Sequence, residues 1–172
     1  MTGRSMGRFF LCILLGCFSG CAGYTIGPIP PTFMRGVRNV AVPIFKNNTL
    51  TPDVETVATT AVIKQIQEDG TFQVSGVDRA DAIVVGTIFL IDRTKSRSLQ
   101  GNVLASAEFN LRVIIDFRIE RPNTGQLMST KRIEGDTSFF VGNDIFTQER
   151  AAIPLAVQDA AVQFASFLTE GW

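Results

Sequence analysis

Side chains that could perform catalysis or bind a metal are scarce in this sequence. It contains no histidine, so the commonest general base and the commonest transition-metal ligand are both absent. Its 3 cysteines, Cys12, Cys17 and Cys21, all lie near the start of the chain. The residues after Cys21 therefore form no internal disulfide and offer no thiolate cage for a metal. Histidine-activated serine or cysteine nucleophiles are excluded, and we expect no metal site and no cofactor.

The remaining catalytic candidates are pairs of carboxylates. An acid–base mechanism could draw on Asp78 with Asp81, or on Asp92 with Glu108. Each pair is better explained as turn residues or as charges on the solvated face of a strand. No segment matches the glycine-rich phosphate loops of nucleotide-binding proteins. We therefore predict that the protein is not an enzyme.

Basic side chains are concentrated in two places, although 16 basic and 16 acidic residues give a formal net charge of zero. That balance predicts no nucleic-acid partner. Arg93, Lys95 and Arg97 lie in a polar segment that predicts a long hairpin loop, and guanidinium groups pair well with phosphate oxygens. This loop is either a contact for a phosphorylated ligand or simply an exposed hairpin tip. Lys131 and Arg132 form a second positive spot with the same two interpretations.

The first residues are arranged as a secretory signal. Arg4 and Arg8 precede an apolar run at 9–18, and small residues then lead to Cys21. The run is about 10 residues, roughly half of what a helix needs to cross a membrane. The order of apolar residues, small residues and cysteine resembles the lipobox of bacterial lipoproteins, in which cleavage before the cysteine precedes its acylation. Cys21 is the expected lipidation site, with Cys17 as the rival position and an unmodified thiol as the remaining alternative.

The chain after this signal divides into a leader and one domain. Residues 1–20 form the predicted signal peptide, and residues 21–38 form an extended linker because glycines and prolines are frequent there. Residues 39–172 are predicted to form a single domain. No apolar stretch of 18 residues follows the signal, so we expect a lipid anchor to hold the protein at its membrane.

The first half of the domain predicts a strand, a helix and a second strand. An apolar run at 39–45 contains Pro43, which indicates an edge or the end of pairing. A polar turn follows, and then Thr51 as an N-cap, with Pro52 as the first residue of a helix that extends to Asp69. A short strand at 71–74 completes a unit that predicts a right-handed parallel crossover.

The second half predicts three long strands and a final helix. A nearly unbroken apolar run at 82–92 is typical of a central strand covered on both faces or packed at its middle. Residues 107–120 alternate between apolar and polar, which predicts one buried face and one wet face. A returning strand at 126–140 contains Gly135 as a candidate bulge. The apolar stripe of the last segment is helical, and Pro154 predicts a break or a kink there.

These elements predict an α+β fold. Two helices pack on one face of a mixed, mostly antiparallel sheet of four to five strands. The opposite face carries the wet side of the 107–120 strand, and we expect it to be available for a partner.

Several segments together resemble one family. They are residues 21–24 (CAGY), 40–49 (VAVPIFKNNT), 80–88 (ADAIVVGTI) and 107–113 (AEFNLRV). In this order they resemble the lipopolysaccharide-assembly lipoproteins of the LptE family, from Cys21 to the C-terminus. The sequence departs from many members at Ala22, where glycine is usual after the lipidated cysteine.

The resemblance implies a non-enzymatic component of the outer-membrane lipopolysaccharide translocon. Members plug the LptD β-barrel, help it assemble and bind lipopolysaccharide. They are lipid-anchored, with palmitate among the acyl groups, on the periplasmic side of the outer membrane. On this interpretation Arg93, Lys95 and Arg97 become candidates for binding the phosphates of lipopolysaccharide.

A second resemblance covers a shorter part of the chain. Residues 40–74 are similar to the α/β domain of TolB-like and CsgG-like periplasmic proteins, which act as interaction modules or as components of oligomeric pores. The long hairpin and the single terminal helix favour the LptE interpretation. An esterase-like enzyme, the third alternative, would need a nucleophile with a base.

Overall fold

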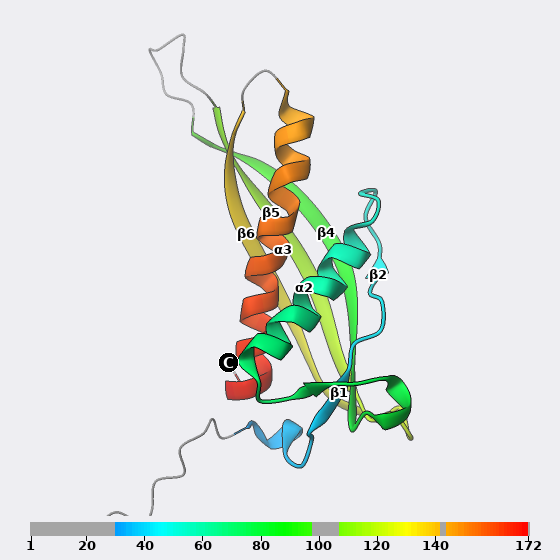
Figure 1. The fold of residues 1–172 in the computed structure, drawn as a ribbon. Helices are drawn as coiled ribbons and strands as arrows, with labels where there is room; N and C mark the ends of the chain where they lie inside the picture. Colours follow the sequence, from blue (N-terminus) through cyan, green and yellow to red (C-terminus); the bar gives the residue numbers. More distant parts are fainter. Residues whose placement is uncertain (1–29, 98–106, 142–143, 172) are drawn as a thin grey trace, which may run out of the picture.

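The computed structural model describes residues 30–97, 107–141 and 144–171, which form two layers. One layer is a sheet, and the other consists of the helices α2 (Val54–Asp69) and α3 (Ile145–Glu170) on one face of it (Figure 1). We call this side the covered face and the opposite side the open face. A short 3-10 helix, η1 (Thr32–Met34), precedes the sheet. The predicted α+β class, with both helices on one face, is confirmed.

Parallel and antiparallel pairing divide the sheet into two parts. Its strand order is β3-β1-β4-β5-β6, and β2 also pairs with β4. The elements are β1 (Asn39–Ala41), β2 (Lys46–Asn47), β3 (Gln73–Val74), the 3-10 helix η2 (Val77–Arg79), β4 (Ala82–Arg97), β5 (Ala107–Glu120) and β6 (Leu127–Val141). The short strands are parallel to their neighbours, whereas β4, β5 and β6 form a long antiparallel meander. The sheet has 6 strands rather than four or five because Lys46–Asn47, predicted to begin a turn, pairs with β4 as β2.

The strand β5 has the predicted alternation, and β4 departs from it at a bulge. The register shifts between Ile88 and Leu90, so that Ile88 lies opposite Ile115 while Leu90 lies opposite Ile114. Phe89 is the extra residue. Phe89 and Leu90 remain 48% and 42% exposed, so the predicted cover on both faces of this strand is absent here. From Ile88 to Ile91 the unbroken apolar run in the sequence instead reflects the bulge.

The helix α2 begins later than predicted. Its N-cap residue is Asp53, and the helix starts at Val54 rather than at Pro52. Asp53 has a φ of 64°, in the left-handed region, and its side chain makes no capping hydrogen bond. The cause lies upstream, because the Asn47 side-chain amide donates to the Thr51 carbonyl oxygen over 2.8 Å. Because this hydrogen bond occupies the Thr51 carbonyl oxygen, Thr51 belongs to the loop before the helix.

The helix α3 is continuous over its full length, Pro154 included. The predicted break at Pro154 is therefore wrong. The carboxylate of Asp144 caps the helix by accepting from the backbone amides of Phe146 (3.0 Å) and Thr147 (3.4 Å), which starts the helix well before the proline. Among the described residues, α3 alone is long and apolar enough to cross a membrane. Because 56% of its apolar window is buried inside the protein, it serves here as the core helix.

Aromatic stacking and close backbone approach join α3 to the sheet. The rings of Phe117 on β5 and Phe164 on α3 stack with centroids 3.8 Å apart. On β6, a Cβ added to Gly135 would lie 2.0 Å from the carbonyl oxygen of Ala156 on α3. Gly135 therefore permits the helix to approach, and it pairs in register with Val113. The bulge predicted at Gly135 is wrong, since the β5–β6 irregularity lies near the far end of β5.

The described chain begins and ends at one pole of the molecule. Met34 of η1 is fully buried, and Phe33 stacks on Phe167 near the C-terminal end of α3, with ring centroids 5.1 Å apart. At the opposite pole, which we call the outer end, β4 ends, β5 begins and α3 begins (Figure 1). Part of the segment predicted to be a linker thus contributes to the core.

Candidate functional site

An open groove lies at the outer end, where the N-terminal ends of α2 and α3 meet β4. Its volume is about 630 Å³. Its walls combine apolar and charged side chains: Leu50, Thr51, Pro52, Asp53, Val54, Val57, Arg93, Phe146, Glu149, Arg150, Ile153 and Pro154. An apolar trough bordered by arginines suits a ligand that has both an apolar and an anionic part.

Arg93, a residue singled out from the sequence, lies in this groove. It belongs to β4, which continues to Arg97, so the hairpin loop predicted from residue 93 onward is wrong for its first part. The Arg93 guanidinium forms an ion pair with Glu149 of α3, and it lies 5.7 Å from the centre of the Phe109 ring. Contacts with Glu149 of α3 and Phe109 of β5 thus orient the Arg93 side chain toward α3.

Lys95 and Arg97 continue along the same strand, but the strand pairing is irregular between them. Lys95 is two residues after Arg93, so it lies on the same, covered side of the sheet. It is opposite Phe109, and its side chain is exposed. The register then shifts between Lys95 and Arg97, and Arg97 lies opposite Glu108. Arg93 and Lys95 are therefore together, and Arg97 is displaced by an irregularity that its spacing in the sequence did not reveal.

Two exposed apolar residues of the groove were missed from the sequence. Leu50 is fully exposed, and Phe146 is 75% exposed. Both stand outside the apolar pattern of the neighbouring elements, Leu50 in a polar turn and Phe146 in the first turn of α3. That mismatch is the signal that could have found them. Arg150, one turn after Phe146, was also missed because only the fold brings it to the groove.

Hydrogen bonds fix the loop that carries Leu50. The Asn47 amide donates to Glu55 on α2 over 2.9 Å, and its carbonyl oxygen accepts from the backbone amide of Thr49 over 2.8 Å. The backbone then enters the left-handed region at Asp53. Left-handed residues other than glycine store backbone strain, and such residues are concentrated at binding sites. This wall of the groove is therefore held in a defined shape.

The open face of the sheet carries a ladder of ion pairs. Arg112 on β5 contacts both Glu134 (3.2 Å) and Asp136 (2.8 Å) on β6. Arg132 donates to both oxygens of Asp116, over 2.6 and 2.7 Å. The Arg132 guanidinium holds the pKa of the Asp116 carboxyl below its usual value, mainly through this hydrogen bond. The face is consequently polar and ordered, with both signs of charge.

An apolar patch interrupts this ladder where the β4 bulge lies. Phe89 and Leu90 project on the open face, and the Arg132 guanidinium lies 4.7 Å from the centre of the Phe89 ring. Bulges next to functional surfaces commonly re-aim a side chain. A partner on this side would meet an apolar centre surrounded by charges.

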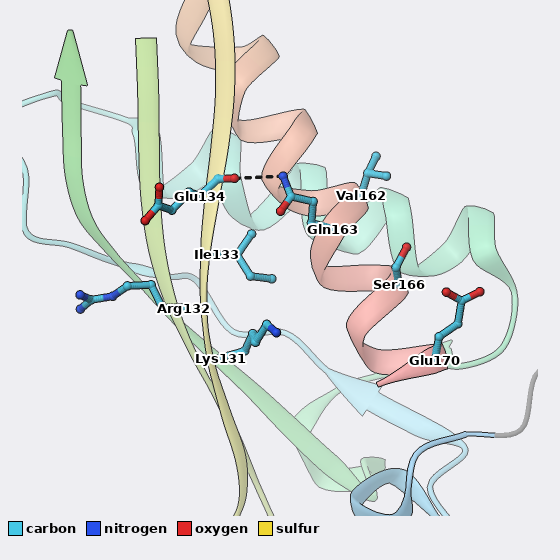
Figure 2. A pocket seen from close by; sticks show the side chains of 8 residues that line it. All are labelled: Lys131, Arg132, Ile133, Glu134, Val162, Gln163, Ser166 and Glu170. Atoms are coloured by element: carbon cyan, nitrogen blue, oxygen red, sulfur yellow. Dashed lines mark hydrogen bonds between the residues drawn. The ribbon is translucent and has the colours of Figure 1, made fainter. Parts of the chain in front are cut away.

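The second positive spot of the sequence, at Lys131 and Arg132, is divided between the two faces. Arg132 belongs to the open face, whereas the Lys131 ammonium lies 5.2 Å from the centre of the Phe167 ring of α3. Lys131 lines a shallow hollow of about 530 Å³ between β6 and the C-terminal half of α3 (Figure 2). The two basic residues therefore do not form one anion site.

Asp81, one of the carboxylates considered for catalysis, has a structural role. Asp81 accepts hydrogen bonds from the backbone amides of Asn39 (2.9 Å) and Arg38 (3.0 Å), and these bonds lower the pKa of its carboxyl. It thereby joins the start of β1 to the loop before β4. In the described parts of the chain, no three acidic or cysteine side chains are grouped so as to hold a metal ion. Cys21 and the rest of residues 1–29 lie outside the described residues.

The fold is similar to that of several solved bacterial proteins. A Helicobacter pylori protein described as a neuraminyllactose-binding hemagglutinin homolog has a TM-score of 0.55 at 11% identity, covering 87% of this chain and 91% of that chain. PelC of Paraburkholderia phytofirmans, solved as a dodecamer, has a TM-score of 0.52 at 15% identity, covering 86% and 99%. At such identities the likeness concerns the fold alone. No curated protein matches the sequence.

The fold first defines the class: the protein is a two-layer α+β module with a polar sheet face and an amphipathic groove. The family follows from the sequence. A family model described as LptE, lipopolysaccharide-assembly, matches residues 37–168. The match covers most of the chain, which therefore belongs to the LptE family of bacterial envelope lipoproteins. Its members are components of lipopolysaccharide assembly rather than enzymes.

Proposed function

We propose that this chain is an outer-membrane lipoprotein of the lipopolysaccharide transport machinery. In this role it plugs the LptD β-barrel, helps that barrel assemble and binds lipopolysaccharide. The observation that carries the proposal is the family match over residues 37–168. Shape and polar contact perform this function, and no covalent bond is made or broken.

The open face supports the proposed contact with a barrel. The lumen of a large outer-membrane barrel is polar, so a plug needs a charged, hydrated surface toward it. The ion pairs of Arg112 and Arg132 supply such a surface with both signs of charge, and Phe89 supplies an apolar centre. Helices cover the other face, which leaves the open face as the larger flat surface for a partner (Figure 1).

The groove at the outer end supports the proposed binding of lipopolysaccharide. Arg93 and Lys95 would bind phosphate groups, with Arg97 following on the same strand. A phosphate oxygen would take the place of the Glu149 carboxylate on Arg93, and the exposed Phe146 and Leu50 would contact an acyl chain. The groove thus offers both kinds of contact that an amphipathic glycolipid needs.

The N-terminal region supports a lipid anchor. We propose that residues 1–20 are removed, that Cys21 is acylated and that residues 21–38 join it to the domain at 39–172. The first described residues lie at the pole opposite the groove (Figure 1). An anchor attached there would leave Arg93 free to meet a ligand away from the attachment point.

Lipopolysaccharide binding is tested by removing the basic side chains of the outer end. The variant Arg93→Ala/Lys95→Ala/Arg97→Ala should bind lipopolysaccharide at least about tenfold more weakly, because charge-assisted contacts to phosphate are lost. A control with the same charge loss elsewhere is Lys64→Ala/Arg79→Ala/Arg121→Ala, which should bind like the wild type. Equal binding by all three proteins would contradict the assignment of this site.

The barrel contact is tested by crosslinking in cells. A photoreactive residue at Asn110, which is exposed on the open face, should crosslink to an outer-membrane barrel of LptD size. The same residue at Lys64, which is exposed on α2, serves as the control and should crosslink less. Crosslinks from Asn110 that join copies of this chain into a ring would contradict the plug and support the TolB-like or CsgG-like alternative.

The anchor is tested by labelling cells with a fatty acid. Wild type and Cys17→Ser should incorporate the label, and Cys21→Ser should not. Label retained in Cys21→Ser and lost in Cys17→Ser would move the lipidation site to Cys17. Absence of label from every protein would contradict the anchor.

A further inference from the structure

The strand β6 forms one edge of the sheet, and its second side has no strand partner among the described residues. It extends from Leu127 to Val141 and is paired with β5 along its whole length. A long edge strand presents a row of free amide and carbonyl groups, which is a template for pairing with another chain. Natural proteins usually protect such an edge.

Two side chains of α3 reach this edge. The Gln163 side-chain amide donates to the carbonyl oxygen of Glu134 over 2.9 Å, a contact drawn as a dashed line in Figure 2. The backbone amide of Asp136 donates to the carboxylate of Asp159 over 3.0 Å. Gln163 also donates to the same Asp159 oxygen over 3.0 Å, which links the two side chains.

The pattern of these bonds is that of a neighbouring parallel strand. In a parallel pair, one residue donates to the carbonyl before its partner and accepts from the amide after it. Here the partner is Gly135, because Glu134 precedes it and Asp136 follows it. Gln163 supplies the donor and Asp159 supplies the acceptor. The two backbone groups that one residue of an added strand would bind are therefore already bonded to side chains of α3.

Close packing of the helix makes this arrangement possible. A Cβ at Gly135 would lie 2.7 Å from the backbone nitrogen of Ala160 and 2.8 Å from its Cβ. Asp159 and Gln163 flank Ala160 on the same helix, so their side chains lie beside the edge at the height of Gly135. Because Gly135 and Ala160 are small, α3 lies close enough for these side chains to form the hydrogen bonds that a neighbouring strand would form.

We infer that Asp159 and Gln163 form a clamp that prevents β6 from pairing edge to edge with β6 of a second copy of this chain. Successive residues of a strand direct their backbone groups to alternate sides, so Thr130, Arg132 and Ser138 also present free groups at this edge. The clamp lies between them and interrupts the row near its middle. A second β6 could then pair only over short runs on either side. This inference does not depend on the proposed function.

The clamp is tested on the full chain as purified in detergent. The variant Asp159→Ala/Gln163→Ala removes both contacts, and Gln163→Glu removes only the donor and adds a charge beside Asp159. Asp159→Asn keeps an acceptor for the Asp136 amide and is the conservative control. Gln148→Ala, at an exposed position of α3 away from the edge, controls for a change in the helix alone.

Two measurements report on the clamp. Hydrogen exchange of the Asp136 amide should be faster by about tenfold in both clamp variants, since the hydrogen bond to Asp159 is lost or weakened. Light scattering over a concentration series should show these variants changing from monomer to dimer, and lysine crosslinking should join Lys131 of the two copies. The wild type and both controls should remain monomeric.

Several results would overturn the inference. Unchanged exchange at Asp136 would mean that the clamp does not form in solution. Faster exchange without dimers would mean that the clamp does not prevent pairing. Dimers whose crosslinks lie on the open face, or a wild type already paired through Lys131, would also contradict it. If the double variant unfolds, Gln163→Glu decides by the same measurements.

Discussion

The two faces of the β4–β5–β6 meander are made by alternate residues of the same strands, yet they depend on different interactions. On the covered face, Phe117 stacks on Phe164 and contacts are apolar and close. On the open face, Arg112 and Arg132 form ion pairs whose side chains are about half exposed. Buried packing contributes strongly to stability, whereas exposed ion pairs contribute little. The covered face therefore maintains the fold, and the open face is free to serve recognition.

The largest expected effect comes from an aromatic residue of the covered face. Phe164→Ala should lower the free energy of unfolding by about 3 to 5 kcal/mol, because the ring is fully buried and stacked on Phe117. Phe89→Ala, the matched change on the open face, should cost less than about 1 kcal/mol, since Phe89 is 48% exposed. Urea unfolding measures both values. Equal losses of unfolding free energy would mean that both faces contribute equally to the stability of the fold.

The next effect comes from the contact between β6 and α3. Gly135→Ala should lower the free energy of unfolding by about 1 to 3 kcal/mol, because the added Cβ meets helix backbone at 2.0 Å. Gly76→Ala is the control, since nothing lies within 4 Å of its added Cβ and its φ is −68°. The urea midpoint should fall for Gly135→Ala and stay unchanged for Gly76→Ala. A tolerated alanine at 135 would show that α3 can move away from the sheet.

The regular parts of the fold could be predicted from the sequence because local patterns determine them. Alternation along β5 gave its buried face correctly, and Gly70, with a φ of 75°, ends α2 at the predicted residue. The departures depend on contacts between elements. The bulge at Phe89, the helix that continues through Pro154 and the close approach at Gly135 are set by packing across the layers, which no single segment encodes.

The candidate site shows the same division. Arg93 and Lys95 were found by residue type, because clustered basic side chains favour an anionic ligand. Their placement on a strand, and the ion pair of Arg93 with Glu149, depend on a helix far along the chain. Leu50 and Phe146 become a shared wall only when α2 and α3 meet. Sequence patterns thus identified the charges but not the groove.

A smaller effect is expected from acid. The backbone hydrogen bonds from Asn39 and Arg38 lower the pKa of Asp81, so its charged form stabilises the native state. This contribution is complete above the unfolded pKa of 3.8 and is lost as the pH falls through the lower folded pKa. Asp81→Asn should therefore be less stable than wild type at pH 7, and the difference should shrink below about pH 4. Thermal unfolding across this pH range measures it, and a constant difference would contradict the role of the charge.

The smallest effect on stability is expected from the ladder on the open face. Arg112→Ala removes two ion pairs, but the side chains involved are about half exposed. The midpoint of thermal unfolding should therefore change by no more than about 2 °C, and raising the salt concentration should reduce even that difference. Capture of the proposed barrel partner should weaken clearly in the same variant, because Arg112 lies in the middle of the proposed contact surface. A large loss of stability with unchanged capture would reverse the comparison and assign the open face to the fold rather than to recognition.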